Sequence, residues 1–176
     1  MTAFLKNHER KRKMITTIVL SAVMMAGLFL MLWGAVGFVQ SEKFFTSAPK
    51  EALDVIQPKE ERFKGQHAVG WIMLILSLAL MGGALIWGAY DGIKNGFGFW
   101  QFFSRFAAML LLLKSYDILF FDYYLLCRSG FFPHYYPEVG PIYGPHLFGY
   151  NRKSHMLQTV LIIAGCLIAA RICTLI

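Results

Sequence analysis

The sequence predicts an all-α membrane protein: a bundle of four transmembrane helices with an irregular loop, rich in aromatic residues and proline, before the last helix. Three observations predict this fold class. Hydrophobic residues make up 57% of the 176 residues and charged residues only 15%. The charges are bunched, and long apolar stretches lie between them, as is typical of lipid-facing segments. We therefore expect residues 1–176 to form a single membrane domain.

A basic cluster precedes the first apolar stretch. It contains Lys6, Arg10, Lys11, Arg12 and Lys13, and it supplies much of the net charge of +7. Such a cluster beside an apolar segment is typical of a cytoplasmic anchor, and nucleic-acid binding is the less simple interpretation. We expect a multi-pass protein of the cell membrane with both termini in the cytoplasm. The expected partner is the lipid bilayer and not nucleic acid.

The first two spans are free of charge. Residues 14–39 exceed the roughly 20 residues that a helix needs to cross a bilayer, and they are too long for the apolar core of a signal peptide. Residues 67–90 form the second span, with Trp71 and Trp87 near its ends, where interfacial aromatic residues are common. The polar residues 40–66 between them predict a solvated loop, in which a short helix begins after Pro49 and stops before Pro58.

The expected third span, residues 101–127, carries charges that a membrane helix disfavours. Lys114 and Asp117 lie three residues apart, so on an α-helix they face each other and form an ion pair. Continuing that face at 100° per residue adds Tyr124 and Arg128. Asp122 is then about 140° away from Asp117 and must meet another helix, a polar loop or water, or be protonated.

We take these residues as a candidate functional polar cluster, because an ionisable group inside a membrane is by default a functional hypothesis. Its members are Lys114, Asp117, Asp122, Tyr124, Arg128 and Glu138. An alternative remains open. The helix can leave the bilayer early, with the residues after about 116 in water and Lys114 reaching toward the interface.

The loop before the last span, residues 131–150, has proline at every fourth position from Pro133 to Pro145 and many aromatic residues. This pattern excludes a long helix and predicts a rigid cap in the outer interface. Glu138 is expected to pair with Arg128 or Arg152. The fourth span follows at residues 156–176.

A metal site can be drawn from four residues of this region, but we expect neither a metal nor a cofactor. The four are His134, Glu138, His146 and His155. Their spacing matches no standard zinc pattern, and histidines beside aromatic residues in a loop usually form hydrogen bonds at an interface.

Two resemblances concern the same region. Asp117, Asp122, Phe132-Pro133, Glu138-Val139-Gly140 and Tyr143 together resemble small bacterial four-span integral membrane proteins that carry no assigned activity. This resemblance implies the four-span topology and implies that the Asp and Glu positions matter. Residues 128–136 resemble the Arg-His-Pro-x-Tyr region of small membrane methyltransferases that act on isoprenoids or phospholipids.

Three function classes therefore remain open, and no catalytic residue is assigned. The first, which we favour, is a module that binds or moves a small solute or a lipid headgroup, or that holds a partner helix of another membrane protein or a second copy. The second is a membrane-embedded enzyme on a lipid-like substrate, methyltransferase-like or metal-assisted. The third is a purely structural subunit. Motifs of soluble nucleotide-binding or hydrolytic enzymes do not occur in the sequence.

Overall fold

The computed structural model of the chain describes residues 2–41, 44, 49–57 and 59–176, and these residues form helices and loops without a β-strand. The long helical elements are α1 (Thr2–Trp33) with η1 (Gly34–Val39), α3 (Gln66–Lys94), α4 (Phe99–Tyr116) with η3 (Asp117–Leu126), and α6 (Arg152–Cys173). The short elements are α2 (Lys50–Leu53), α5 (Phe131–Tyr135), η4 (Pro137–Val139) and η5 (Pro145–Leu147).

Three segments among the described residues are long and apolar enough to cross a membrane. They are Arg10–Val39, Gln66–Lys94 and Arg152–Cys173. The sequence prediction of apolar spans is confirmed for these three. The segment formed by α4 and η3 runs beside them, but its charged side chains lower its hydropathy.

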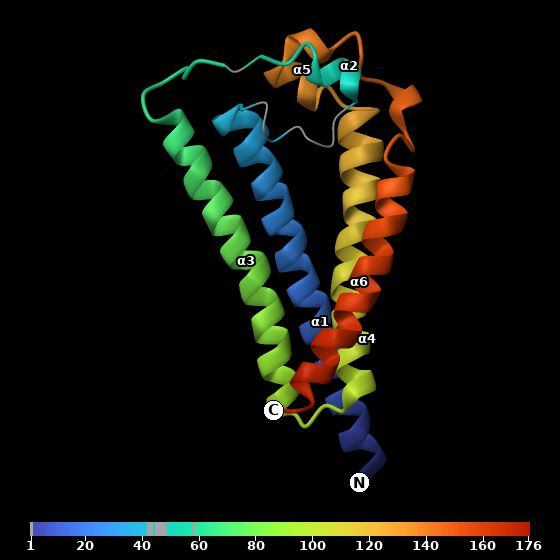
Figure 1. Cartoon of the computed structure of the whole chain (residues 1–176). Helices are drawn as coiled ribbons and strands as arrows, with labels where there is room; N and C mark the ends of the chain where they lie inside the picture. Colours follow the sequence, from blue (N-terminus) through green and yellow to red (C-terminus); the bar gives the residue numbers. More distant parts are fainter. Residues whose placement is uncertain (1, 42–43, 45–48, 58) are drawn as a thin grey trace.

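The helices diverge from one end of the molecule to the other (Figure 1). α1 packs against α3 and α4, and α4 packs against α6. Both termini and the short connection between α3 and α4 lie at one end, which we call the closed end, where α3 and α6 converge. At the other end, the open end, α1 and α3 splay away from η3 and α6, and the loops with α2 and α5 lie across the top.

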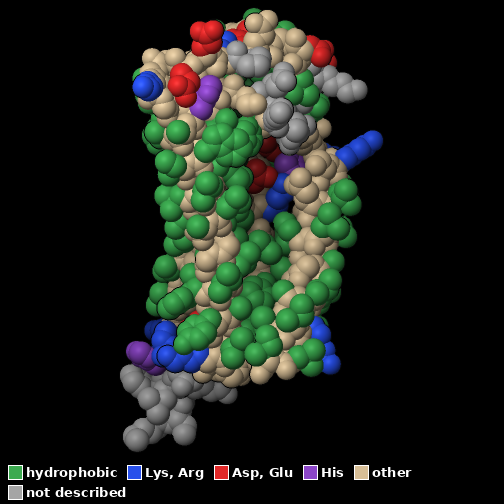
Figure 2. All heavy atoms as spheres, turned by 60° about the vertical axis from the view of Figure 1, so that its left-hand side comes forward, with side chains coloured by type: hydrophobic (Ala, Val, Ile, Leu, Met, Phe, Trp, Pro, Cys, Tyr) green, Lys and Arg blue, Asp and Glu red, His purple; other side chains and the backbone are tan. Residues whose placement is uncertain are grey.

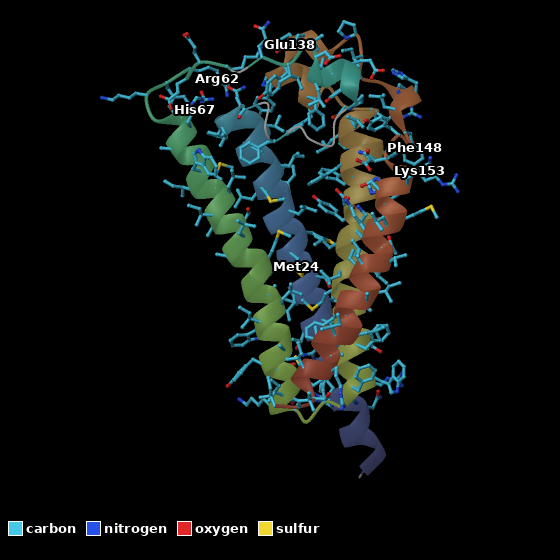
Figure 3. All side chains as sticks on the ribbon, viewed as in Figure 1. Met24, Arg62, His67, Glu138, Phe148 and Lys153 are labelled. Atoms are coloured by element: carbon cyan, nitrogen blue, oxygen red, sulfur yellow. The ribbon has the colours of Figure 1, made fainter. Side chains whose placement is uncertain are left out.

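The helices pack through separate hydrophobic clusters at the closed end, at the middle and at the open end of the bundle. At the closed end Phe97, Phe102 and Phe106 pack with Cys166 and Ala170. Met24, at the middle of the bundle, packs with Leu20, Ala84 and Met109 (Figure 3). At the open end the cap loop packs on the helices through a cluster that contains Val36, Ala52, Ile56, Phe121, Leu125, Phe132, Tyr136 and Val139.

The sequence predicted one continuous α-helix for the third long segment, and the structure differs. From Asp117 to Leu126 it is wound as a π-helix, and η1 at the end of α1 is wound in the same way. A π-helix has i→i+5 hydrogen bonds, so residues five apart lie nearly above one another, and such segments often occur at functional sites. The face assignments based on 100° per residue therefore do not apply after Tyr116.

The loops differ from the prediction in detail. The short helix after Pro49 ends at Leu53, five residues before Pro58, and α6 begins at Arg152, four residues before the predicted span. Between Phe131 and Tyr150 the structure has only short helical pieces. The open end of α3 is fixed by the buried side chain of Gln66, which donates to the carbonyl oxygen of Phe38 and to Gln40.

Candidate functional site

Lys114 and Asp117 form the ion pair that their spacing predicts. Lys114 Nζ lies 2.7 Å from Asp117 Oδ2 and 2.5 Å from Oε1 of Gln158 on α6. The Lys114 side chain is 10% exposed and that of Asp117 is 28% exposed, so the cation is the more buried partner. A buried cation needs such partners, because an unpaired charge in this setting costs several kcal/mol. The pair also joins the third long segment to α6.

Asp122 meets another helix, which was one of the alternatives that the sequence left open. Its Oδ2 lies 2.5 Å from Nε2 of His155, in the first turn of α6. The two side chains are 22% and 17% exposed. A second polar contact thus joins η3 to α6, one turn nearer to the cap than the first.

The π-helix brings the two acids to the same cavity. On an α-helix Asp117 and Asp122 would point about 140° apart. On η3 they are five residues apart, which is the repeat of the i→i+5 hydrogen bonds, and both line one pocket. The predicted separation of the two acids is therefore wrong, because the helix that carries them has wider turns than the prediction assumed.

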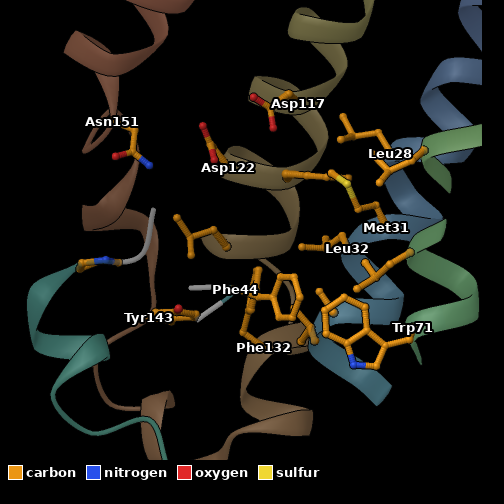
Figure 4. A pocket seen from close by; sticks show the side chains of 17 residues that line it. Leu28, Met31, Leu32, Phe44, Trp71, Asp117, Asp122, Phe132, Tyr143 and Asn151 are labelled. Atoms are coloured by element: carbon orange, nitrogen blue, oxygen red, sulfur yellow. The ribbon is translucent and has the colours of Figure 1, made fainter. Parts of the chain in front are cut away.

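This pocket, the acidic pocket, has a volume of about 410 Å³ and lies between the splayed helices at the open end. Its walls come from α1 with η1, α3, η3 and the loops. Besides Asp117, Asp122 and Asn151, the lining consists of Leu28, Met31, Leu32, Ala35, Val36, Phe44, Pro49, Trp71, Leu74, Leu78, Phe121, Leu126, Phe132 and Tyr143. Figure 4 shows the two carboxyl groups near one end of the pocket and the aromatic rings of Phe44, Trp71 and Phe132 near the other.

The basic partners of the acids do not line the acidic pocket. Neither Lys114 nor His155 is among the lining residues, but each pairs with one of the two acids, and basic and histidine side chains are visible in the same hollow as acidic ones (Figure 2). Tyr143 adds a neutral phenol from the loop at residues 131–150, and burial raises its pKa from 10.0 to about 12.

Glu138 pairs with a residue that the sequence did not suggest. Its Oε1 lies 2.7 Å from Lys59 Nζ in the first loop, so the predicted pairing with Arg128 or Arg152 is wrong. Burial acts to raise the pKa of Glu138, but hydrogen bonds from Lys59 and from the backbone outweigh it, and the pKa lies below its ordinary value. Glu138 fastens the cap loop to the first loop, away from the acidic pocket (Figure 3).

The other two members of the predicted cluster also lie apart from the acids. Tyr124 is 51% exposed and stacks on Phe120, and the guanidinium of Arg128 lies 5.6 Å from the ring of Tyr123. The π-helix explains this outcome, since Tyr124 and Arg128 share the face of Asp117 only when the segment turns as an α-helix.

The four residues from which a metal site was drawn do not meet. Glu138 contacts Lys59 and His155 contacts Asp122, while His134 and His146 are exposed. Within the described ranges, no group of three or more His, Cys, Asp or Glu side chains is placed to hold a metal ion.

Sequence reasoning missed two polar partners, Gln158 and Asp91, and considered His155 only as a possible metal ligand. Gln158 and His155 on α6 hold Lys114 and Asp122, and Asp91 on α3 lies 2.7 Å from Nη1 of Arg105. The signals were present. Gln158 is a polar residue near the start of the span 156–176, His155 directly precedes that span, and Asp91 and Arg105 each lie seven residues from Gly98 in the turn between α3 and α4.

Comparison with known proteins gives no relative from which a function can be taken: no protein-family model, no curated protein and no solved structure matches the chain.

Proposed function

We propose that the chain is a multi-pass membrane protein with four spans, in which α4 with η3 is the third crossing in chain order and both termini face the cytoplasm. Three apolar helices of spanning length support this, as does the position of both termini at the closed end (Figure 1). Charged residues in α4 and η3 are tolerated in a span when they face partners inside the bundle, as Arg105, Lys114 and Asp122 do.

Labelling of single cysteines with a membrane-impermeant reagent tests this topology. We expect a cysteine placed at Lys94 to react only from the cytoplasmic side and one at Lys153 only from the outer side. Reaction of both positions from the same side would contradict a crossing by α4 and η3.

We further propose that the protein binds an amphiphile whose polar head meets Asp117 and Asp122 and whose apolar part lies along the rest of the acidic pocket. One observation carries the proposal: a cavity of about 410 Å³ whose lining is apolar except for two carboxyl groups, one carboxamide and a few aromatic polar atoms. Ligand sites of this size commonly combine a mostly apolar lining with a few polar groups that fix orientation.

The chemistry of the lining selects the head group. Carboxyl oxygens accept hydrogen bonds, and Asp117 and Asp122 line the pocket whereas their partners Lys114 and His155 are not among its lining residues. The pocket therefore favours an ammonium group or a head with several hydroxyl donors. A fatty acid or an alkyl phosphate fits less well, because its head group, like the two carboxyl groups, offers mainly hydrogen-bond acceptors.

The position of the pocket gives a lipid-like ligand access from the bilayer. In Figure 2 the molecular surface is hollowed in the half near the cap, and acidic, basic and histidine side chains are visible inside, surrounded by hydrophobic ones. The hollow lies on the side of the molecule where α3 and α6 diverge. At the closed end the cluster of Phe102, Phe106 and Cys166 fills the space between the helices.

Binding can be tested with purified protein in nanodiscs and three probes of equal chain length: dodecylamine, dodecanol and dodecanoic acid. We expect dodecylamine to raise the thermal unfolding temperature most and dodecanoic acid least. Asp117→Asn and Asp122→Asn should each abolish the preference for the amine, because an amide neither attracts a cation nor repels an acid.

Asp54→Asn is the matched control, since Asp54 is an exposed acid in the first loop, outside the pocket lining. Its response to the probes should equal that of the wild type. Equal stabilisation by the three probes, or an amine preference that survives in Asp117→Asn/Asp122→Asn, would contradict the proposed head group.

A second candidate function is catalysis at the same place, and the contact between His155 and Asp122 favours it. A histidine held by a carboxyl group can transfer protons in general acid–base chemistry. His155→Gln separates the two proposals. Under the binding proposal, the affinity of His155→Gln for dodecylamine should stay within about twofold of the wild-type value, because His155 does not line the pocket. Conversion of a bound lipid by the wild type, lost in His155→Gln, would instead establish an enzyme.

A further inference from the structure

A second cavity, which we call the basic groove, lies at the closed end between α1 and α4. Its volume is about 610 Å³, and it is separate from the acidic pocket, with which it shares no lining residue. One wall comes from α1, where Arg10, Lys13, Thr17 and Ile18 lie on one helix face. The other comes from the facing turns of α4 and from the preceding loop.

Charge changes along the groove. Arg10 and Lys13 lie at its outer end, beside the exposed ring of Trp100, whose side chain is 70% exposed. Toward the middle of the bundle the lining becomes apolar, with Met14, Ile18 and Leu112. A cationic end next to an interfacial tryptophan, followed by an apolar channel, matches a phospholipid in the order headgroup, interface and acyl chain.

Arg105 adds positive charge beneath the outer end of the groove. It is 3% exposed, and its Nη1 donates to Asp91 Oδ2 and to the carbonyl oxygen of Gly88. Its Nε and Nη2 are buried without a hydrogen-bond partner among the described residues. Both this guanidinium and Lys13 lie over the ring of Phe97, with Arg105 Cζ 4.3 Å and Lys13 Nζ 4.7 Å from the ring centroid.

The charges around the groove do not cancel. Asp91 neutralises one edge of Arg105 from the side of α3, and it does not line the groove. Arg10 and Lys13 keep their charge at the outer end, and Arg12, on a neighbouring part of α1, is held by Asn95 at 2.6 Å. An anion in the groove would therefore meet Arg10 and Lys13 at the outer end, and Arg105 is a third cation in the lining.

We propose that the basic groove binds an anionic phospholipid, with its phosphate against Arg10 and Lys13 and one acyl chain against Met14, Ile18 and Leu112. This site lies at the other end of the bundle from the acidic pocket and is independent of the function proposed for it. The occupant is a lipid and not a free anion, because the apolar part of the groove has no complement in a small ion.

The test uses purified protein in nanodiscs of phosphatidylcholine with increasing amounts of phosphatidylglycerol, and the readout is the thermal unfolding temperature. We expect phosphatidylglycerol to stabilise the wild type. In Arg10→Gln/Lys13→Gln the apparent affinity should fall by about tenfold or more, since each cation near a membrane surface contributes about 1 kcal/mol toward an anionic lipid.

The matched control is Lys11→Gln/Lys94→Gln, which removes the same charge from exposed positions at the same end but outside the groove. It should respond to phosphatidylglycerol like the wild type. Equal losses in the two double variants would mean a diffuse surface effect and would overturn the proposal.

Two further measurements locate the lipid. Phosphatidylglycerol with brominated acyl chains should quench tryptophan fluorescence in the wild type more strongly than in Trp100→Phe, because Trp100 lines the groove. Inorganic phosphate added to protein in phosphatidylcholine should give little stabilisation. Full stabilisation by phosphate alone, or quenching unchanged in Trp100→Phe, would overturn the assignment to a lipid.

Discussion

Ion pairs contribute to the cavities at both ends of the bundle, but the member that lines the cavity is acidic at the open end and basic at the closed end. At the open end Asp117 and Asp122 line the cavity, and their partners Lys114 and His155 are not among its lining residues. At the closed end Arg105 lines the groove, and its partner Asp91 lies behind it. The difference shows that the charge a cavity offers to a ligand is set by which member of a pair faces inward. The sign of the charge that lines each cavity cannot be deduced only from which charged residues its helices carry.

The most damaging single change should break the pair at the closed end. Asp91→Leu leaves Arg105 buried and without its carboxylate, and we expect a loss of about 3 kcal/mol in the free energy of unfolding. Thermal and denaturant unfolding in detergent measure this loss. Asp54→Leu, at an exposed acid, is the control, and a loss below about 1 kcal/mol in Asp91→Leu would show that Arg105 does not depend on Asp91.

A change at the open end should separate stability from binding. Lys114→Met removes the cation from Asp117 and should cost about 2 kcal/mol, whereas Lys114→Met/Asp117→Leu should recover most of it, because no unpaired charge remains. The double variant should still lose its preference for dodecylamine over dodecanoic acid. Recovery of both stability and preference would show that Asp117 does not select the head group.

Filling the acidic pocket should alter binding with little change in stability. Leu78 lines the pocket and is 62% exposed, so Leu78→Trp should change the free energy of unfolding by about 0.5 kcal/mol or less. Binding of dodecylamine should weaken by about fivefold, since the added ring occupies ligand volume. Leu76→Trp, on the same helix outside the pocket lining, should bind normally, and equal loss in both variants would place the ligand elsewhere.

The smallest effect concerns the link between the cap and the first loop. Because the pKa of Glu138 is lowered in the folded protein, the unfolded chain binds more protons in acid. The stability that Glu138 contributes is therefore present above its ordinary pKa of 4.5 and is lost as the pH falls through the lower folded value.

This contribution should be only about 0.2–1 kcal/mol, since Lys59 and Glu138 are both partly exposed. Unfolding temperatures measured between neutral and acidic pH should decline less in Glu138→Gln than in the wild type. Lys59→Met should reduce the decline in the same way, and an unchanged decline in both variants would exclude this pair as its source.

The apolar spans were predictable because each is long and uncharged, and the pair of Lys114 and Asp117 was predictable because three residues separate them on an ordinary helix. The direction of the Asp122 side chain was not predictable, because it depends on the change from α-helix to π-helix, and no residue between Asp117 and Leu126 indicates that change. The partner of Glu138 was not predictable either. Lys59 lies 79 residues earlier, in a loop whose path is set by the packing of the cap.

The winding of η3 has a consequence for how this protein can change. If the same ten residues were to tighten into an α-helix, the segment would lengthen and Asp122 would swing away from its neighbour toward a different side of the bundle. A shift of hydrogen bonds by one position would thus dismantle a two-acid site without altering either acid. The type of helix at η3 therefore determines whether the two acids share a pocket, just as the identity of their side chains determines what the pocket can bind.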